Sequence, residues 1–378
     1  MLRSEDTDAC VEALRTLGVR IDRAASDDVV VQGTGGAFPN HDVTVWCGDA
    51  GTCARFLPPA AALGSGAITF DGTEQLRRRP LAATLDALRT LGAGIAPEVR
   101  GLPFTMRAAG LAGGRIEIPS AQSSQPLSGV LMAAPGARAR VEVHAPGLVS
   151  RAYVAMTIDL MAQFGATVDV RSDDVFVVDP QRYRATELAI EADASAASYF
   201  FAAAAVCGGS VTVPNLTRRS RQSDVGFVDV LASMGCAVEE VAGGLRVTRD
   251  FSAELQGIDV DMNEMSDTFM TLACVAPFAA APVTIRNVAH VRVKESDRIH
   301  AVVTNLRALG VQVDERDDGV TVYPGVPRAG TVDAFGDHRI AMSFSVLGLR
   351  TEGVVIDGAE CVAKTVPDFF DRWEQLLR

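Results

Sequence analysis

The sequence predicts a two-domain protein of mixed α/β class, and three observations support this prediction. The chain has 378 residues, which is more than one hydrophobic core usually serves. Its hydrophobic content of 48% beside 22% charged residues is typical of a globular protein. A helix–glycine–strand pattern also recurs at nearly constant spacing, so we expect repeated βαβαββ units, three to a domain.

Each repeat is marked by an apolar residue and a glycine at the end of a predicted amphipathic helix. These stops are separated by 74, 73, 70 and 75 residues: Leu17-Gly18, Leu91-Gly92, Phe164-Gly165, Met234-Gly235 and Leu309-Gly310. Glycine suits the left-handed residue that ends many helices. A sixth predicted helix, Pro367–Leu377, falls about where the next stop would. Six units divide the chain into domains at 1–188 and 189–378.

Each complete unit predicts two loops at helix starts, one of small and polar residues and one of charged residues. The small-residue loops are Gly48–Arg55, Ser120–Gln125, Glu191–Ser198, Asn263–Thr268 and Gly336–Arg339. The charged loops are Ser4–Asp8, Leu76–Pro80, Leu148–Ala152, Arg218–Asp224, Arg292–Arg298 and Val362–Asp368. Helix N-termini attract anions, and equivalent helices of a repeat point the same way. We therefore expect the loops to converge on a site for a small polyanion between the domains.

The charged segment Val291–Arg298 is the most informative part of the chain. Five of its eight residues are charged, and it joins a predicted strand at Pro282–Asn287 to a predicted helix that follows it. It also holds Lys294, one of only two lysines beside 33 arginines; the other is Lys364. Nearly every basic position of the chain is arginine, so a lysine at this position favours a chemical role for the compact ammonium group of Lys294. The alternative for any charge run is a solvated helix cap.

Other residues in these loops have the chemistry of an anion site. Ser120–Gln125 concentrates hydroxyl and amide groups at a helix start, although an ordinary serine-rich cap is the alternative. Asp267 and Glu295 are acidic residues in otherwise cationic loops, which suits residues that act in general acid–base catalysis. The alternative is that they form ion pairs with nearby arginines. The basic residues that could hold a phosphate and a carboxylate are Arg79, Arg298, Arg339 and Lys364.

Composition excludes several other classes. A net charge of −12 argues against a nucleic-acid or anionic-membrane surface. The seven cysteines form no C-x-x-C pair and no Cys/His cluster, so neither a disulfide framework nor a metal site is predicted. No signal peptide or membrane span is predicted either. We expect a cytoplasmic location.

Taken together, the motifs resemble those of the 5-enolpyruvylshikimate-3-phosphate synthase (EPSP synthase) family. They follow the family's order over essentially the whole chain: G-D-A-G-T-C-A-R, R-R-P-L, S-S-Q, E-A-D-A-S-A-A-S-Y-F, R-V-K-E-S-D-R, G-D-H-R-I-A-M and A-K-T-V-P-D-F-F. The resemblance implies an inside-out α/β barrel of two domains. It implies transfer of the enolpyruvyl group from phosphoenolpyruvate to the 5-hydroxyl of shikimate 3-phosphate by a monomer that needs no metal or organic cofactor.

The resemblance also implies a role for particular residues. Those expected to contact shikimate 3-phosphate are Ser123, Ser124, Gln125, Ser150, Asp267, His290 and Lys294. Those expected to contact phosphoenolpyruvate are Gly51, Arg79, Gln125, Arg298, Arg339 and Lys364. The implied catalytic residues are Asp267 as base, Glu295 as proton donor and Lys294.

Three departures from the family pattern leave alternatives open. His290 stands where many members carry Asn, and Asp49 stands where Asn is common. The family's N-terminal K-S-x-S-x-R loop has no counterpart, so we expect these 378 residues alone to show little or no transfer. A longer product or a complementing peptide would supply that loop. The alternatives are an enolpyruvyl transferase acting on another phosphorylated acceptor, such as a nucleotide, and a non-catalytic homologue that binds anions.

Overall fold

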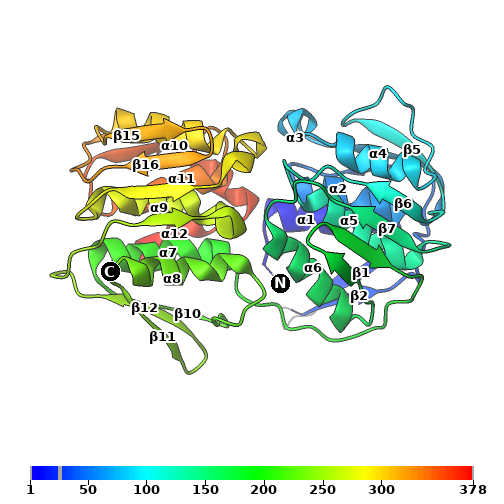
Figure 1. Ribbon diagram of the computed structural model, residues 1–378, viewed down its shortest axis with the longest axis horizontal. Helices are drawn as coiled ribbons and strands as arrows, with labels where there is room; N and C mark the ends of the chain where they lie inside the picture. Colours follow the sequence, from blue (N-terminus) through cyan, green and yellow to red (C-terminus); the bar gives the residue numbers. More distant parts are fainter. Residues whose placement is uncertain (1, 24–27, 377–378) are drawn as a thin grey trace. The chain divides into compact units, whose positions relative to one another are not determined.

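The computed structural model describes residues 2–23 and 28–376, and the chain forms two compact units. The first unit is Met1–Ala189 and the second is Ile190–Arg378, whereas the sequence placed the boundary after residue 188. Figure 1 shows that each unit combines helices with small sheets, which is the mixed α/β class expected.

Among its described residues, the first unit contains three sheets, with strand orders β1-β2, β3-β4-β5 and β6-β7-β9-β8. Its elements are α1 (Glu5–Thr16), β1 (Arg20–Arg23), β2 (Val29–Gln32), β3 (Val43–Trp46), α2 (Gly51–Ala61), β4 (Ser65–Asp71), α3 (Glu74–Arg78), α4 (Ala82–Thr90), β5 (Phe104–Ala109), β6 (Gly114–Glu117), α5 (Gln125–Ala133), η1 (Ala134–Gly136), β7 (Val141–His144), α6 (Arg151–Gln163), β8 (Asp169–Ser172) and β9 (Val175–Val178).

The second unit, as described up to residue 376, also contains three sheets, with orders β10-β12-β11, β13-β14-β16-β15 and β17-β18. Its elements are α7 (Ala194–Cys207), β10 (Gly209–Pro214), η2 (Ser223–Gly226), α8 (Phe227–Ser233), β11 (Ala237–Val241), β12 (Gly244–Arg249), β13 (Asp259–Asp261), η3 (Asn263–Thr268), α9 (Phe269–Val275), η4 (Ala276–Phe278), β14 (Val283–Arg286), η5 (Ala289–Val293), α10 (Arg298–Ala308), β15 (Val313–Arg316), β16 (Gly319–Val322), β17 (Gly330–Asp333), α11 (His338–Gly348), β18 (Val354–Asp357), η6 (Ala359–Lys364) and α12 (Phe369–Gln375).

The predicted helix stops are confirmed. Each of the five glycines follows the last residue of a helix or its C-cap and has φ between 78° and 103°, the left-handed conformation that glycine adopts most easily: Gly18, Gly92, Gly165, Gly235 and Gly310. The sixth predicted helix is α12, which is shorter than expected, and Leu377 lies outside the described residues.

The middle of the second unit is helical, with its sheets outside (Figure 1). Helices α7, α9 and α11 are almost wholly buried. Small polar side chains link them, since the hydroxyls of Ser198 and Thr271 lie 3.3 Å apart and those of Thr271 and Ser343 also lie 3.3 Å apart. Small residues let the helices approach closely, and this close packing fixes the positions of their N-termini.

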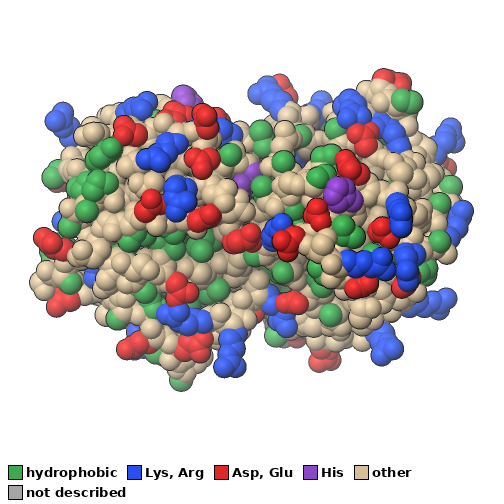
Figure 2. Space-filling view, viewed as in Figure 1, with side chains coloured by type: hydrophobic (Ala, Val, Ile, Leu, Met, Phe, Trp, Pro, Cys, Tyr) green, Lys and Arg blue, Asp and Glu red, His purple; other side chains and the backbone are tan. Residues whose placement is uncertain are grey.

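One face of the protein carries both signs of charge. Acidic and basic side chains alternate over the face drawn in Figure 2. None of the described helices is long and apolar enough to cross a membrane.

Candidate active site

In the first unit, three predicted loops lie at the N-termini of α2, α5 and α6. Their N-cap residues, Ala50, Ser124 and Ser150, make no side-chain capping hydrogen bond. Backbone N–H groups at helix N-termini of this kind are suited to bind an anion. Ser150 also has φ of +51°, a left-handed conformation that costs a non-glycine residue energy and is common at functional sites.

These three helix starts belong to one cluster. A Cβ on Gly129 of α5 would lie 2.3 Å from the carbonyl oxygen of Arg55 in α2, so the two helices touch within their second turns. The Thr157 hydroxyl of α6 donates to the Ser128 hydroxyl of α5 at 2.9 Å. Because these contacts lie within two turns of the helix starts, the backbone N–H groups gather in one region.

The predicted serines lie at this cluster. Ser124 and Ser150 are both buried, and the Ser123 hydroxyl accepts a hydrogen bond from the Gln125 backbone N–H at 3.2 Å. Four of the seven residues expected to contact shikimate 3-phosphate thus lie at the starts of two packed helices: Ser123, Ser124, Gln125 and Ser150.

Gly51 and Arg79 lie against each other, as residues of one anion site would. A Cβ on Gly51 would be 2.6 Å from Nη1 of Arg79, so a larger residue there would displace the guanidinium from this position. Arg55 fixes both loops, since it donates to the carbonyl of Gly51 at 3.0 Å and to that of Pro80 at 2.7 Å. Sequence reasoning gave Arg55 no role. Its position one helical turn after Gly51 is the signal that could have suggested it.

In the second unit, Arg298 organises a cluster of carboxylates. This side chain is 2% exposed and makes four hydrogen bonds. Nε donates to Asp337 at 2.8 Å, Nη1 to Asp267 at 2.9 Å, and Nη2 to Glu295 at 2.8 Å and to Asp337 at 3.3 Å. One buried guanidinium therefore holds three acidic residues that come from separate elements.

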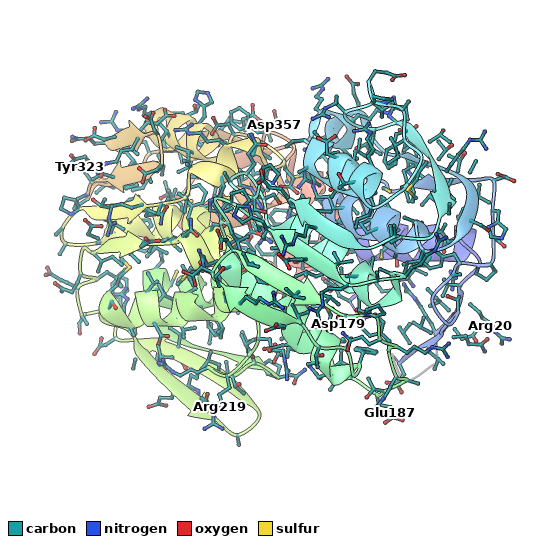
Figure 3. The ribbon with its side chains drawn as sticks, turned by 45° about the vertical axis from the view of Figure 1, so that its right-hand side comes forward. Arg20, Asp179, Glu187, Arg219, Tyr323 and Asp357 are labelled. Atoms are coloured by element: carbon teal, nitrogen blue, oxygen red, sulfur yellow. The ribbon has the colours of Figure 1, made fainter. Side chains whose placement is uncertain are left out.

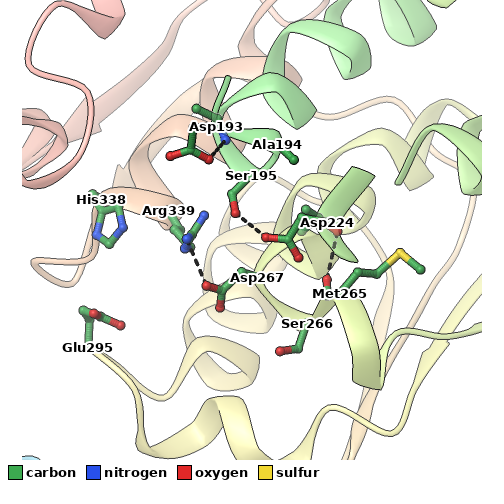
Figure 4. Close-up of polar contacts among 12 residues, drawn as sticks. Asp193, Ala194, Ser195, Asp224, Met265, Ser266, Asp267, Glu295, His338 and Arg339 are labelled. Carbon is green, nitrogen blue, oxygen red and sulfur yellow. Dashed lines mark hydrogen bonds and ion pairs between the residues drawn. The ribbon is translucent and has the colours of Figure 1, made fainter. Parts of the chain in front are cut away.

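Asp267 also forms an ion pair with a second arginine, Arg339. Nη2 of Arg339 lies 2.9 Å from the other carboxylate oxygen of Asp267 (Figure 4). Burial alone would raise the pKa of Asp267, but Arg339, Arg298 and Lys294 outweigh it and hold the pKa well below its usual range. Asp267 is therefore ionised at neutral pH and can accept a hydrogen bond from a hydroxyl group.

Asp337 and His338 extend this cluster at the start of α11. The Asp337 carboxylate caps the helix through the Arg339 backbone N–H at 3.0 Å and accepts a hydrogen bond from the Ser296 hydroxyl at 3.0 Å. Burial lowers the pKa of His338 to about 3, although Asp337 acts in the opposite direction. Figure 4 shows His338 near Arg339 and Glu295. Sequence reasoning placed both residues in the loop Gly336–Arg339 but included neither among the site residues.

His290 is a buried neutral imidazole beside this cluster. Its Nε2 lies 2.9 Å from the Ser266 hydroxyl. Burial, with a contribution from Lys294, lowers the pKa of His290 to about 4. The neutral ring can exchange hydrogen bonds with a polar ligand much as the amide of Asn would.

The two lysines both occupy the predicted loops. Lys294 follows η5, and its charge contributes to the lowered pKa values of Asp267 and His290. Lys364 is buried at the end of η6, which packs against α11.

We expect the stability of the protein to fall as the pH drops from 6.5 to 4. A histidine with a lowered folded-state pKa is neutral in the folded protein while the unfolded chain already takes up a proton, so acid favours unfolding. For His290 the loss amounts to at most about 3 kcal/mol over this interval. Chemical unfolding of the His290→Asn variant should show a shallower pH dependence, with His338 still contributing. His300→Asn, at an exposed position, is the matched control and should leave the slope unchanged. Equal slopes in all three proteins would contradict the assignment.

Fold and site together define a class of protein. Two α/β units with buried inner helices, a cluster of helix N-termini and a network of arginines and carboxylates suit a protein that binds small anions. The family described as EPSP synthase (3-phosphoshikimate 1-carboxyvinyltransferase) matches residues 1–373, and the chain belongs to this family.

Individual relatives agree with this assignment. The 3-phosphoshikimate 1-carboxyvinyltransferase of Nostoc punctiforme is 43% identical, over all of this chain and 89% of the relative. 3-phosphoshikimate 1-carboxyvinyltransferase 2 of Halalkalibacterium halodurans is 40% identical, over all of this chain and 85% of the relative.

Solved structures show the same fold. EPSP synthase from Acinetobacter baumannii matches with a TM-score of 0.82 and 26% identity, over 99% of this chain and 88% of that one. The enolpyruvyl transferase NikO from Streptomyces tendae matches with a TM-score of 0.72, over 99% of this chain and 87% of that one. At 16% identity, NikO is evidence for the fold alone. The inside-out enolpyruvyl transferase fold expected from the sequence is thereby confirmed.

Proposed function

We propose that this protein transfers the enolpyruvyl group of phosphoenolpyruvate to the 5-hydroxyl of shikimate 3-phosphate and releases inorganic phosphate. The observation that carries the proposal is the ionised Asp267 between Arg298 and Arg339, with Glu295 on the same Arg298. This arrangement offers a hydroxyl acceptor, a second carboxyl group and fixed positive charge within one cluster.

The first unit offers donors for the phosphate of shikimate 3-phosphate. The N-termini of α5 and α6 supply backbone N–H groups, and Ser123, Ser124, Gln125 and Ser150 supply side-chain donors. Asp267, Lys294 and His290 of the second unit would bind the ring hydroxyls or the same phosphate. That the two groups of residues face one another stays a prediction, as do the monomeric state and the cytoplasmic location.

Phosphoenolpyruvate would bind to other basic residues of the site. Arg79, Arg339 and Lys364 provide charge for its phosphate and carboxylate, with Gly51 allowing close approach of the backbone. Arg298 already makes four hydrogen bonds to carboxylates. We therefore propose that Arg298 contributes to this ligand mainly by its charge and by holding Asp267 and Glu295 in place.

The chemistry would proceed in two steps. The 5-hydroxyl oxygen bonds to C2 of phosphoenolpyruvate while its proton passes to Asp267 and C3 gains a proton from Glu295. The C2–O bond to phosphate then breaks, and the departing phosphate takes up the proton that Asp267 received, so that Asp267 is ionised again. C3 returns its proton to Glu295, and the C2=C3 double bond forms again. Binding of phosphoenolpyruvate to Arg339 would weaken the ion pair between Arg339 and Asp267. The pKa of Asp267 would then rise, making it a better base.

We expect Lys364→Ala and Arg339→Ala to weaken phosphoenolpyruvate binding by about 10- to 100-fold, because a charge-assisted hydrogen bond contributes about 1.5–3 kcal/mol. Shikimate 3-phosphate should be affected much less, as titration calorimetry of each ligand would show. Arg20→Ala is the control, since Arg20 lies exposed on β1, outside the predicted loops (Figure 3).

Two results would count against these assignments. Equal weakening of both ligands would mean that the residue roles are wrong. Binding of a nucleoside monophosphate without any binding of shikimate 3-phosphate would replace the proposed acceptor by the alternative one.

A further inference from the structure

A fully buried tyrosine of the second unit lies close to the proposed anion site. Tyr199 is in the second turn of α7, and its side chain is fully buried. Its ring packs edge-on against Phe369, with the ring centroids 5.8 Å apart. Phe369 begins α12, five residues after Lys364. Because a ring fixed in this way keeps its hydroxyl away from solvent, that hydroxyl needs a hydrogen-bond partner inside the protein.

The Tyr199 hydroxyl lies near Arg339, at the start of α11. Helices α7 and α11 pack against each other. Burial raises the pKa of Tyr199 to about 12, and Arg339 acts in the opposite direction because its charge is close to the phenol oxygen. With this pKa the hydroxyl keeps its proton at neutral pH. Tyr199 also lies one helical turn after Ser195, which Figure 4 shows together with Arg339.

Although Arg339 is close, the Tyr199 hydroxyl has no partner among the described residues that meets the geometry of a hydrogen bond. Most buried polar groups have such a partner, and an unpaired one costs stability. A phenylalanine would fill nearly the same space without that cost. Arg339 carries only donors, so the phenol oxygen is the acceptor in any hydrogen bond between the two side chains. An unpaired hydroxyl beside a ligand-binding arginine favours a functional role.

Arg339 is attracted by acidic groups on more than one side. Burial alone would lower the pKa of Arg339, but Asp267, Tyr199, Asp224 and Asp193 hold it well above its usual range. Among the described carboxylates, the one at ion-pair distance is Asp267, 2.9 Å from Nη2. A guanidinium has five N–H groups in a fixed fork, so Arg339 has further donors when Nη2 holds Asp267. One of them can serve the Tyr199 oxygen.

We propose that Tyr199 is a positioning residue that holds Arg339 in place for phosphoenolpyruvate. When the ligand weakens the ion pair between Arg339 and Asp267, an N–H of the guanidinium donates to the Tyr199 oxygen. The hydroxyl then gains a hydrogen bond that it lacks in this structure, and Arg339 keeps a fixed direction toward the ligand. This inference rests on the proposed function, in which phosphoenolpyruvate binds at Arg339.

Tyr199→Phe should have different effects on folding and on binding. The variant should unfold at the same urea concentration as the unmodified protein or at a higher one, because no hydrogen bond is lost and a buried polar group is removed. Its affinity for phosphoenolpyruvate should fall by about 3- to 30-fold, because a hydrogen bond from a charged group is lost. The affinity for shikimate 3-phosphate should stay unchanged. A purely structural tyrosine would not change the affinity for one ligand alone.

A double-mutant cycle tests whether Tyr199 acts through Arg339. Titration calorimetry measures the affinity for phosphoenolpyruvate of the unmodified protein, Tyr199→Phe, Arg339→Ala and the double variant. Once the guanidinium is absent, Tyr199→Phe should cause no further loss of affinity. Arg339→Gln, whose amide can still donate to Asp267, replaces Arg339→Ala if the alanine variant does not fold.

Tyr323→Phe is the matched control. Tyr323 belongs to the same unit, follows β16 and is labelled in Figure 3. Its hydroxyl donates to Asp314 at 2.8 Å, so this tyrosine already has the partner that Tyr199 lacks. Tyr323→Phe should leave the affinity for phosphoenolpyruvate unchanged and should not raise the urea concentration at which the protein unfolds.

Three results for Tyr199→Phe would overturn the positioning role while the proposed function stands. They are an unchanged affinity for phosphoenolpyruvate, an equal loss of affinity with and without Arg339, and unfolding at a lower urea concentration, which would show that the hydroxyl is already hydrogen-bonded.

Failure of the proposed function would be seen separately, in the unmodified protein. If that protein does not bind phosphoenolpyruvate, the proposed function fails, and inorganic phosphate takes its place as the ligand in the same cycle. Should Arg339→Ala alter the affinity for neither anion, or should neither anion bind, the role of Tyr199 would be overturned as well.

Discussion

Replacing Arg298 by methionine is expected to lower the free energy of unfolding by about 3–5 kcal/mol. Methionine fills a similar volume but leaves Asp337, Asp267 and Glu295 without the guanidinium that they share. Asp337 is fully buried, so its ionised carboxylate would lose its main source of stabilisation. Urea unfolding followed by circular dichroism would measure the effect.

Arg292→Met is the matched control for this experiment. Arg292 lies six residues earlier and also bonds two carboxylates, those of Asp297 and Glu315, but its side chain is 25% exposed. Partly exposed ion pairs contribute about 1 kcal/mol or less. If both variants lost the same stability, burial of the Arg298 cluster would not be the cause. Should Arg298→Met fail to fold, Arg298→Lys keeps the charge and should retain part of the lost stability.

Replacing Glu295 by glutamine is expected to lower kcat by about 10²- to 10⁴-fold, which is the usual contribution of a positioned acid or base. The amide oxygen of glutamine can still accept the hydrogen bond from Arg298, so the cluster should stay folded. It can no longer deliver the proton that C3 of phosphoenolpyruvate requires. The measurement is the steady-state release of inorganic phosphate, with the affinity for each substrate determined separately.

Glu315→Gln serves as the control for Glu295→Gln. Glu315 pairs with Arg292, and neither was assigned to the substrates. A raised KM with unchanged kcat in Glu295→Gln would assign this residue to binding instead. An unchanged kcat/KM would remove it from the proposed mechanism.

The repeat and the helix boundaries could be predicted from the sequence because local rules control them. The left-handed glycine after each amphipathic helix depends on the backbone of a single residue, so Gly92 and Gly310 mark helix ends without any tertiary contact. The position of the site loops followed from the same boundaries. Ser124 and Ser150, for example, are N-cap residues of α5 and α6.

The partners of the charged residues were decided only by the tertiary structure. Arg298 meets Asp267 and Asp337, which lie 31 and 39 residues away in sequence, because helix packing brings those segments together. No local pattern states that Arg298 is the shared partner of three carboxylates, or that burial keeps His290 neutral. The sequence therefore determined where the reactive residues stand in each repeat, whereas long-range packing determined which of them meet and in what charge state.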